Sequence, residues 1–146
     1  MKYTSGSREA TYEIGKGLGE KAAPGSIFAL AGDLGAGKTV FAKGFAEGVG
    51  VKETVTSPTF TIMQLYESGR IPLAHFDVYR IEDPDELDEI GFDEYIGGDG
   101  VTLIEWHERA EDLIPETALE VLLSPQEDGS RIITLIPHGR WEAEHR

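Results

Sequence analysis

The chain has 146 residues with 13 basic and 27 acidic side chains, so its net charge at pH 7 is −14. This length argues against two independent domains, and the negative charge argues against unaided nucleic-acid binding, since phosphate contacts require cations. The sequence has no cysteine and no apolar segment long enough for a signal peptide or a membrane span, which excludes disulfide bonds and indicates a soluble, cytoplasmic protein without a membrane partner.

The first predicted element is a helix over residues 7–22, where apolar side chains recur at every fourth position. Gly15, Gly17 and Gly19 lie inside it, and each costs about 1 kcal/mol relative to alanine. This helix is therefore either weak or packed closely against another backbone. A short apolar run over residues 26–31 follows, and such a run is typical of a strand buried on both faces of an α/β sheet.

A glycine-rich loop follows this strand and matches the phosphate-binding pattern G-x-x-x-x-G-K-[ST]. In this pattern, backbone N–H groups wrap the phosphates at close range, and glycine permits φ values that a side chain would penalise. Lys38 adds a charge for the phosphates, the hydroxyl of Thr39 can bind Mg²⁺, and the following helix directs its positive end at the anion. The matching residues are Gly32, Asp33, Leu34, Gly35, Ala36, Gly37, Lys38 and Thr39. The loop predicts a nucleotide site, and the apolar spacing after it predicts a helix capped by Gly50.

The rest of the chain predicts an α/β fold with hairpins. Strands are expected over residues 61–66, 71–78, 101–104, 118–123 and 131–136, with a turn at 68–70, and a helix is expected to begin near Asp83. We therefore expect one P-loop NTPase-like domain over residues 1–137, followed by a tail over residues 138–146. Its central sheet should be mainly parallel, with helices on both faces and antiparallel hairpins added.

Two acids and one hydroxyl are candidates for the chemistry of a P-loop site. Asp77 ends the apolar stretch 73–77 and Glu105 follows the stretch 101–104. Ligands of α/β folds bind at the carboxyl edge of the sheet, so both acids could hold a metal or position water there; otherwise they are ordinary solvated acids. Thr59, in the segment 57–59, could offer a switch hydroxyl to the nucleotide or belong to a simple turn.

Two absences narrow the class of nucleotide-binding protein. The sequence has no asparagine, so it lacks the N-K-x-D element by which typical GTPases select guanine, and ATP is favoured. No lysine or arginine lies between Arg80 and Arg109, which argues against a small-molecule kinase with an arginine-bearing lid. An ATPase is the favoured interpretation. A small-molecule P-loop kinase and a non-hydrolysing nucleotide-sensing protein remain the alternatives.

Taken together, the motifs resemble those of the TsaE (YjeE) family, the ATPases of bacterial tRNA threonylcarbamoyladenosine biosynthesis. The matching stretches are residues 32–39, 57–60, 75–80, 83–87 and 103–106, and their order and spacing agree over about residues 10–115. The resemblance implies a small α/β protein that binds ATP or ADP with Mg²⁺ and hydrolyses ATP slowly.

The resemblance also implies residue roles. Lys38 and the loop backbone would hold phosphates, Thr39 and Glu105 would hold Mg²⁺, and Asp77 would be the acid needed for hydrolysis. Thr59 would be the switch residue and Trp106 would lie close to the nucleotide. Further contacts to the nucleotide would come from the segments that contain Arg8, Ser130 and Arg131.

Partners follow from the same resemblance. Members of the family act with TsaB and TsaD, of which TsaD carries the transferase chemistry, so this chain would reach tRNA only through its partners. The charge is uneven, because residues 1–50 carry a net +1 (6 basic, 5 acidic) and residues 51–146 a net −15 (7 basic, 22 acidic). Nine acids without a lysine or arginine lie between Glu82 and Asp99, and they form either a solvated face or a docking surface for a basic partner.

Overall fold

The computed structural model describes residues 2–32, 37–53, 55, 63–77, 98–105 and 117–137. The helices and strands in these ranges are β1 (Lys2–Ser5), α1 (Arg8–Lys21), β2 (Ile27–Ala31), α2 (Lys38–Val49), β3 (Met63–Tyr66), β4 (Leu73–Asp77), β5 (Val101–Glu105), β6 (Ala118–Pro125) and β7 (Arg131–Pro137). Neither helix is long and apolar enough to cross a membrane. The helix predicted near Asp83 and the tail over 138–146 lie outside the described residues.

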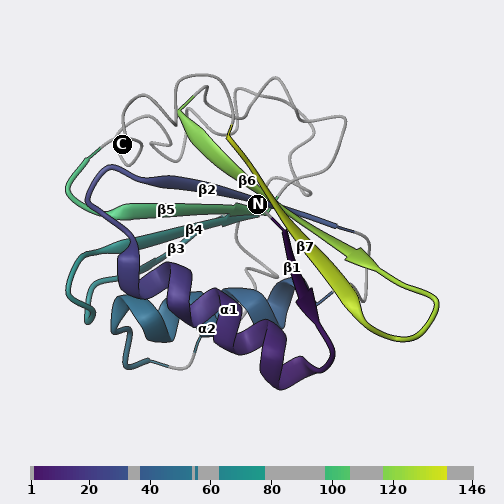
Figure 1. Ribbon diagram of the computed structural model, residues 1–146. Helices are drawn as coiled ribbons and strands as arrows, with labels where there is room; N and C mark the ends of the chain where they lie inside the picture. Colours follow the sequence, from purple (N-terminus) through teal and green to yellow (C-terminus); the bar gives the residue numbers. More distant parts are fainter. Residues whose placement is uncertain are drawn as a thin grey trace.

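The strands form one mixed sheet in the order β1-β7-β6-β2-β5-β4-β3 (Figure 1). The four central strands β6, β2, β5 and β4 are parallel, while β3, β7 and β1 pair with their neighbours in antiparallel fashion. The predicted α/β fold with a mainly parallel centre and two added hairpins is thus confirmed. Because β2, β5 and β4 are parallel neighbours, their carboxyl ends lie at the same edge of the sheet, where the candidate acids are found.

Strand β1 was not expected from the sequence. Its four residues have no apolar alternation, and only Ser5 among them is buried. The strand forms because it pairs with β7, with Lys2 opposite Thr134 and Ser5 opposite Arg131. A pairing partner about 130 residues away therefore decides the structure of this segment.

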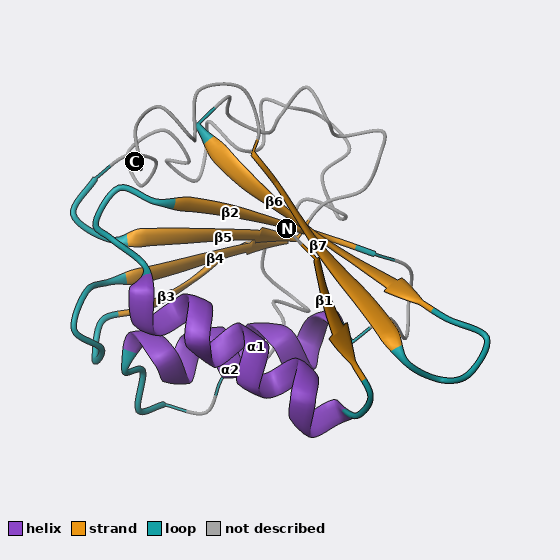
Figure 2. Cartoon of the chain, viewed as in Figure 1, coloured by secondary structure: helices purple, strands orange, loops and turns teal. Residues whose placement is uncertain are grey.

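The two described helices lie side by side on one face of the sheet (Figure 2). The described residues do not test the expectation that helices also cover the other face, because the segment 78–97 lies outside them. Helix α1 begins after Ser7, whose hydroxyl accepts a hydrogen bond from the Ala10 N–H at 3.0 Å, as expected of an N-cap. Helix α2 ends at Gly50, which has a φ of 100° and closes the helix through its N–H to Ala46. Phe28 of β2 packs edge-on against Phe45 of α2, so the helical layer and the sheet share one core.

Glycines let α1 and α2 touch backbone to backbone. A Cβ added to Gly15 or Gly19 would lie 2.4 or 2.1 Å from a carbonyl oxygen of α2, and one added to Gly44 or Gly48 would lie 2.1 Å from a carbonyl oxygen of α1. A Cβ at Gly17 would meet nothing within 4 Å. Of the two possibilities that the sequence left open for this helix, close packing is therefore the correct one.

The same contacts set the direction of the helices. Gly15 lies against Phe41, and Gly19, one turn later, lies against Phe45, also one turn later. The helices therefore run in the same direction, and their N-terminal ends lie at the same end of the pair. This parallel arrangement brings the first turn of α1 to the start of α2.

The turn between β3 and β4 closes the other end of both helices. The backbone N–H of Arg70 donates to the Val49 carbonyl at 2.9 Å, at the end of α2. Its guanidinium Nη2 donates to the carbonyls of Gly19 and Glu20 at 2.7 and 3.1 Å, at the end of α1. The last carbonyls of a helix lack partners within the helix, and a cation there also complements the helix dipole.

We expect Arg70→Ala to lower the free energy of unfolding by about 1 kcal/mol, because two helix-end carbonyls lose a charged donor. Urea denaturation followed by circular dichroism measures this change. Arg70→Lys is the control, since it keeps the charge without the planar donor group, and it should recover part of the loss. An unfolding midpoint that Arg70→Ala leaves unchanged would show that this contact contributes nothing.

Candidate functional site

A cavity of about 340 Å³ lies where the N-terminal ends of α1 and α2 meet the start of β7. It is lined by Arg8, Thr11, Gly37, Lys38, Thr39, Val40 and Arg131. Among the described residues that line it, three are cationic and none is acidic, although the whole chain carries a net charge of −14. A concave site with this charge favours an anionic ligand.

The two helix ends add to the positive potential of the cavity. Arg8 is the first residue of α1 and Lys38 is the first residue of α2, so each helix directs its N-terminal end toward the same space. A helix N-terminus carries a partial positive charge and N–H groups that suit phosphate oxygens. The parallel packing of the helices through their glycines is what brings these two ends together.

Gly37 is required at the cavity for two reasons. Its φ is 96°, a conformation that side chains other than glycine rarely adopt. In addition, a Cβ at this position would lie 3.2 Å from Nε of Arg131 and 3.6 Å from Cγ2 of Thr11. The side chain of Arg131 therefore lies directly against the last glycine of the predicted phosphate loop.

Thr11 connects the cavity to the edge strand β1. Its hydroxyl and that of Ser5 are 2.6 Å apart and buried, and both lie within hydrogen-bonding distance of the Ser7 carbonyl, so one hydroxyl donates to the other and the second donates to Ser7. These bonds connect the end of β1 to the first turn of α1, where Arg8 is located. The sequence did not identify Thr11 as a site residue, because a single threonine on a predicted helix carries no pattern that indicates a ligand.

The turn between β6 and β7 leads into Arg131. Asp128 Oδ1 accepts hydrogen bonds from the Ser130 hydroxyl at 2.6 Å and from the Ser130 N–H at 2.9 Å. Ser130 does not line the cavity, although the sequence placed it with Arg131 at the nucleotide. These two hydrogen bonds hold the pKa of Asp128 below its ordinary value of 3.8, and the bond from the Ser130 side chain has the larger effect.

We expect a carboxyl-carbon NMR titration to give Asp128 a pKa below 3.8 in the folded protein, and Ser130→Ala to raise it. The lowered pKa means that the ionised carboxylate stabilises the turn above its unfolded pKa. This contribution is lost as the pH falls through the folded pKa. A pKa that does not respond to Ser130→Ala would contradict the assigned cause.

Asp77 and Glu105 lie together at the carboxyl edge of the sheet, next to the strand that leads into the loop. They are opposite each other in the β4–β5 register, and Glu105 is also opposite Leu30 of β2. Glu105 is only 6% exposed, whereas Asp77 is half-buried. Neither acid lines the 340 Å³ cavity. The structure thus places the acids next to the end of β2 but outside the cavity itself.

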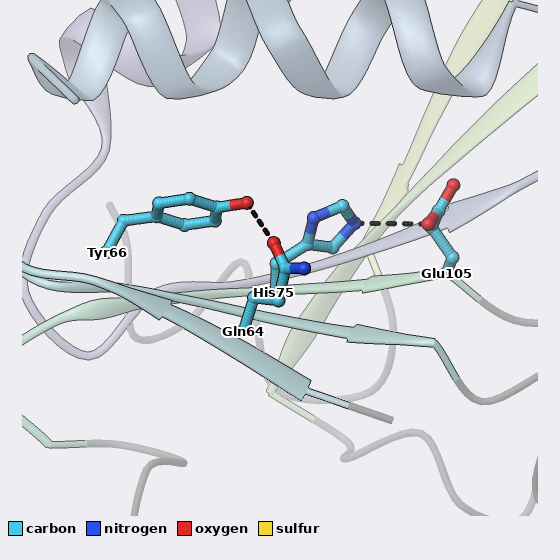
Figure 3. A network of polar contacts seen from close by, with 4 residues as sticks. All are labelled: Gln64, Tyr66, His75 and Glu105. Atoms are coloured by element: carbon cyan, nitrogen blue, oxygen red, sulfur yellow. Dashed lines mark hydrogen bonds and ion pairs between the residues drawn. The ribbon is translucent and has the colours of Figure 1, made fainter. Parts of the chain in front are cut away.

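A buried histidine contacts Glu105. His75 Nε2 lies 3.1 Å from Glu105 Oε2 (Figure 3). His75 is not among the residues that the sequence predicts for the site, although it stands two positions before Asp77 and therefore on the same face of β4. That spacing is a signal that could have identified it.

The remaining predicted site residues lie outside the described residues. They are Asp33, Leu34, Gly35, Ala36, Thr59 and Trp106. Of the others, Arg8, Gly37, Lys38, Thr39 and Arg131 meet at one cavity, and Asp77 and Glu105 meet at one sheet edge. Within the described ranges, no group of three or more histidine, aspartate or glutamate side chains could enclose a metal ion.

Comparisons with known proteins agree on one family. A family model described as "Threonylcarbamoyl adenosine biosynthesis protein TsaE" matches residues 5–133. A Bacillus subtilis protein named "tRNA threonylcarbamoyladenosine biosynthesis protein TsaE" is 45% identical over 97% of this chain and 89% of its own length. A protein of the same name from Treponema pallidum is 42% identical over 92% of this chain and 99% of its own length.

A solved structure supports the same relationship. The crystal structure of Bacillus subtilis YdiB matches with a TM-score of 0.83 and 40% sequence identity, covering 98% of this chain and 89% of that one. The range matched by the family model includes every residue that lines the cavity, together with Asp77 and Glu105.

Proposed function

Since the chain belongs to the TsaE family of tRNA threonylcarbamoyladenosine biosynthesis proteins, we propose that it serves this pathway as an ATPase that binds ATP or ADP with Mg²⁺. The observation that carries the proposal is the convergence of Arg8, Lys38 and Arg131 on one cavity at two helix N-termini. These three cations come from separate elements of a strongly acidic chain. A polyphosphate is the ligand that best explains their convergence.

The nucleotide phosphates lie at the start of α2 in this proposal. Lys38 supplies a point charge, and the two arginines offer planar donors from α1 and β7. Gly37 lets the side chain of Arg131 approach the backbone at the end of the phosphate loop. Phosphoryl transfer depends mainly on positioning and charge neutralisation, and these residues supply both. Asp77, at the adjacent sheet edge, positions the attacking water.

The residues present fit a magnesium ion. Thr39 offers a hydroxyl oxygen and Glu105 a carboxylate, and hard oxygen donors of this kind are those that Mg²⁺ prefers. Mg²⁺ keeps several waters and uses substrate phosphates as ligands, so a site of this type does not need three protein carboxylates. When bound, the ion would neutralise charge on the phosphates.

The proposed partners are a TsaB–TsaD type pair, with tRNA contacted through them. The net charge of −14 supports an indirect contact with tRNA, because the acidic chain alone is poorly suited to binding the phosphate backbone of tRNA. We therefore propose a slow intrinsic ATPase whose rate rises when the pair is present. Hydrolysis by this chain supports the cycle of the complex, and the transfer of the threonylcarbamoyl group belongs to the partner.

Reconstitution tests this function. ATP hydrolysis and tRNA modification are measured with the partner pair, with and without this chain, and with Lys38→Ala as the inactive control. We expect modification to require the wild-type chain over multiple turnovers and the ATPase rate to rise with the pair. Equal modification without the chain would refute the role in the pathway. Normal ATP binding by Lys38→Ala would refute the nucleotide site.

A further inference from the structure

The buried contact between His75 and Glu105 is not explained by the nucleotide site described above. Their side chains are 1% and 7% exposed, and His75 Nε2 lies 3.1 Å from Glu105 Oε2. Burying a carboxylate is costly unless a donor satisfies it. Among the described residues, the imidazole is therefore the group that compensates for the burial of this Glu105 oxygen.

The hydrogen-bonding pattern shows which of the two side chains is the donor. An ionised carboxylate can only accept, so Nε2 of His75 carries the hydrogen and donates to Glu105. Nδ1 is also buried, and it has no hydrogen-bond partner among the described residues. A hydrogen on Nδ1 would lack an acceptor among the described residues, so the contact with Glu105 favours a hydrogen on Nε2. Among the described residues, Glu105 is the only hydrogen-bonding partner of the His75 ring.

The neighbours of His75 do not require a polar side chain at this position. Leu73, on the same face of β4, and Leu103, opposite His75 in the β4–β5 register, are buried and apolar. An apolar residue would suit this packing. The contact with Glu105 is therefore the reason for a histidine here.

The pair lies beneath the helical layer at the end of the sheet that carries the acids (Figure 3). Gln64 of β3 is opposite His75 in the register, and its Oε1 accepts a hydrogen bond from the Tyr66 hydroxyl. One oxygen of Glu105 faces the imidazole, and the other is turned away from it (Figure 3). Such a contact fixes the carboxylate plane and leaves one oxygen for another ligand.

We propose that His75 is a positioning residue that orients the Glu105 carboxylate for the metal of a metal–nucleotide complex. This inference rests on the proposed function, because it takes Glu105 to be a metal ligand. Partners that orient a ligating carboxylate commonly change metal affinity by about 10- to 100-fold when they are removed. His75 should therefore control the Mg²⁺ requirement of nucleotide binding and have little influence on the nucleotide alone.

The test uses three variants of the full chain. His75→Phe keeps a buried ring but removes the hydrogen-bond donor. His75→Gln restores an N–H donor, which is carried by the terminal amide of the glutamine side chain. Phe76→Leu is the matched control, because Phe76 is the next residue on β4, is fully buried, and points to the other face. Thermal unfolding of each variant reports its stability, and the probe is ADP with a fluorescent label on the ribose.

Binding of this probe is measured in EDTA and then over a Mg²⁺ titration. We expect His75→Phe to raise the Mg²⁺ concentration at half-effect by at least about tenfold, while ADP affinity in EDTA changes less than about twofold. His75→Gln should return the Mg²⁺ midpoint to near the wild-type value. Phe76→Leu should lower the melting temperature and leave the midpoint unchanged. A shift of the melting temperature alone in His75→Phe, or an equal Mg²⁺ shift in Phe76→Leu, overturns the positioning role.

A fourth variant separates this inference from the proposed function. If Glu105→Gln does not alter the Mg²⁺ dependence, Glu105 is not a metal ligand and both proposals about it are wrong. If Glu105→Gln raises the midpoint but His75→Phe does not, only the positioning role is wrong. Should His75→Phe fail to fold, nitrogen NMR of the wild-type imidazole decides the matter. Mg²⁺ with ADP must then shift the His75 Nε2 resonance more than ADP in EDTA does, and equal shifts overturn the inference.

Discussion

Gly19→Ala is expected to lower the free energy of unfolding by about 3 kcal/mol, which is a large part of the stability of a domain of this size. The added Cβ would lie 2.1 Å from the Phe45 carbonyl oxygen and 3.1 Å from the Val49 nitrogen, which are backbone atoms of α2. A backbone cannot move aside as a flexible side chain can, so the helices must separate. Gly44→Ala should have a similar effect, because its Cβ would lie 2.1 Å from the Tyr12 carbonyl oxygen of α1.

Gly17→Ala is the control for this prediction. It lies on the same helix, yet nothing lies within 4 Å of its added Cβ. Alanine should therefore raise the stability by up to about 1 kcal/mol through its higher helix propensity. Urea denaturation of the three variants gives the comparison. Equal effects of Gly17→Ala and Gly19→Ala would show that close helix packing is not what these glycines provide.

The helix packing also bears on function, because Arg8 and Lys38 belong to different helices. If α1 moves away from α2, the two cations no longer line one cavity. We therefore attribute the glycine-rich first third of the chain to two separate requirements. One is the phosphate loop, and the other is the backbone contact that positions α1 beside it.

Asp77→Asn is expected to lower the rate of ATP hydrolysis by about 100-fold or more, the usual scale for losing a group that handles the proton of the attacking water. Nucleotide affinity should change less than about twofold, because Asp77 does not line the cavity that holds the cations. The two quantities are measured as phosphate release with the partner pair present and as ADP binding by calorimetry. A hydrolysis rate equal to that of the wild-type chain would remove Asp77 from the mechanism.

Asp99→Asn is the matched control for Asp77→Asn. It makes the same change of charge, but Asp99 is exposed and precedes β5, at the opposite edge of the sheet. Its hydrolysis rate should equal that of the wild-type chain. The same assays distinguish the alternative functions. A wild-type chain that binds nucleotide but releases no phosphate would be a sensor, and a phosphorylated acceptor would identify a kinase.

Much of the fold could be predicted because it depends on local patterns. The spacing of apolar residues identified both described helices, and short apolar runs identified β2, β4 and β5. Gly50 marked the end of α2 because a left-handed glycine acts on neighbouring backbone groups. Strand β1 escaped prediction because nothing within its four residues favours a strand until β7 lies beside it.

The candidate site was predictable in its parts and not in its arrangement. The pattern at residues 32–39 identified Lys38 and Thr39, and the positions of Asp77 and Glu105 after apolar runs identified the acids. The resemblance to the family added Arg8 and Arg131. Pattern alone could not place Arg131 against Gly37, nor could it pair the Ser130 hydroxyl with Asp128.

The sequence by itself determined the phosphate-loop motif, both described helices and every described strand except β1, because each is a property of residues close together in the chain, and the set of motifs indicated the family. Only the tertiary structure decided why α1 contains glycines, which cations share a cavity, and that His75 faces Glu105. The physical reason is distance along the chain. Gly19 meets Phe45, His75 meets Glu105, and Arg131 meets Gly37 only after the sheet has paired and the helices have packed, so no local pattern encodes these contacts.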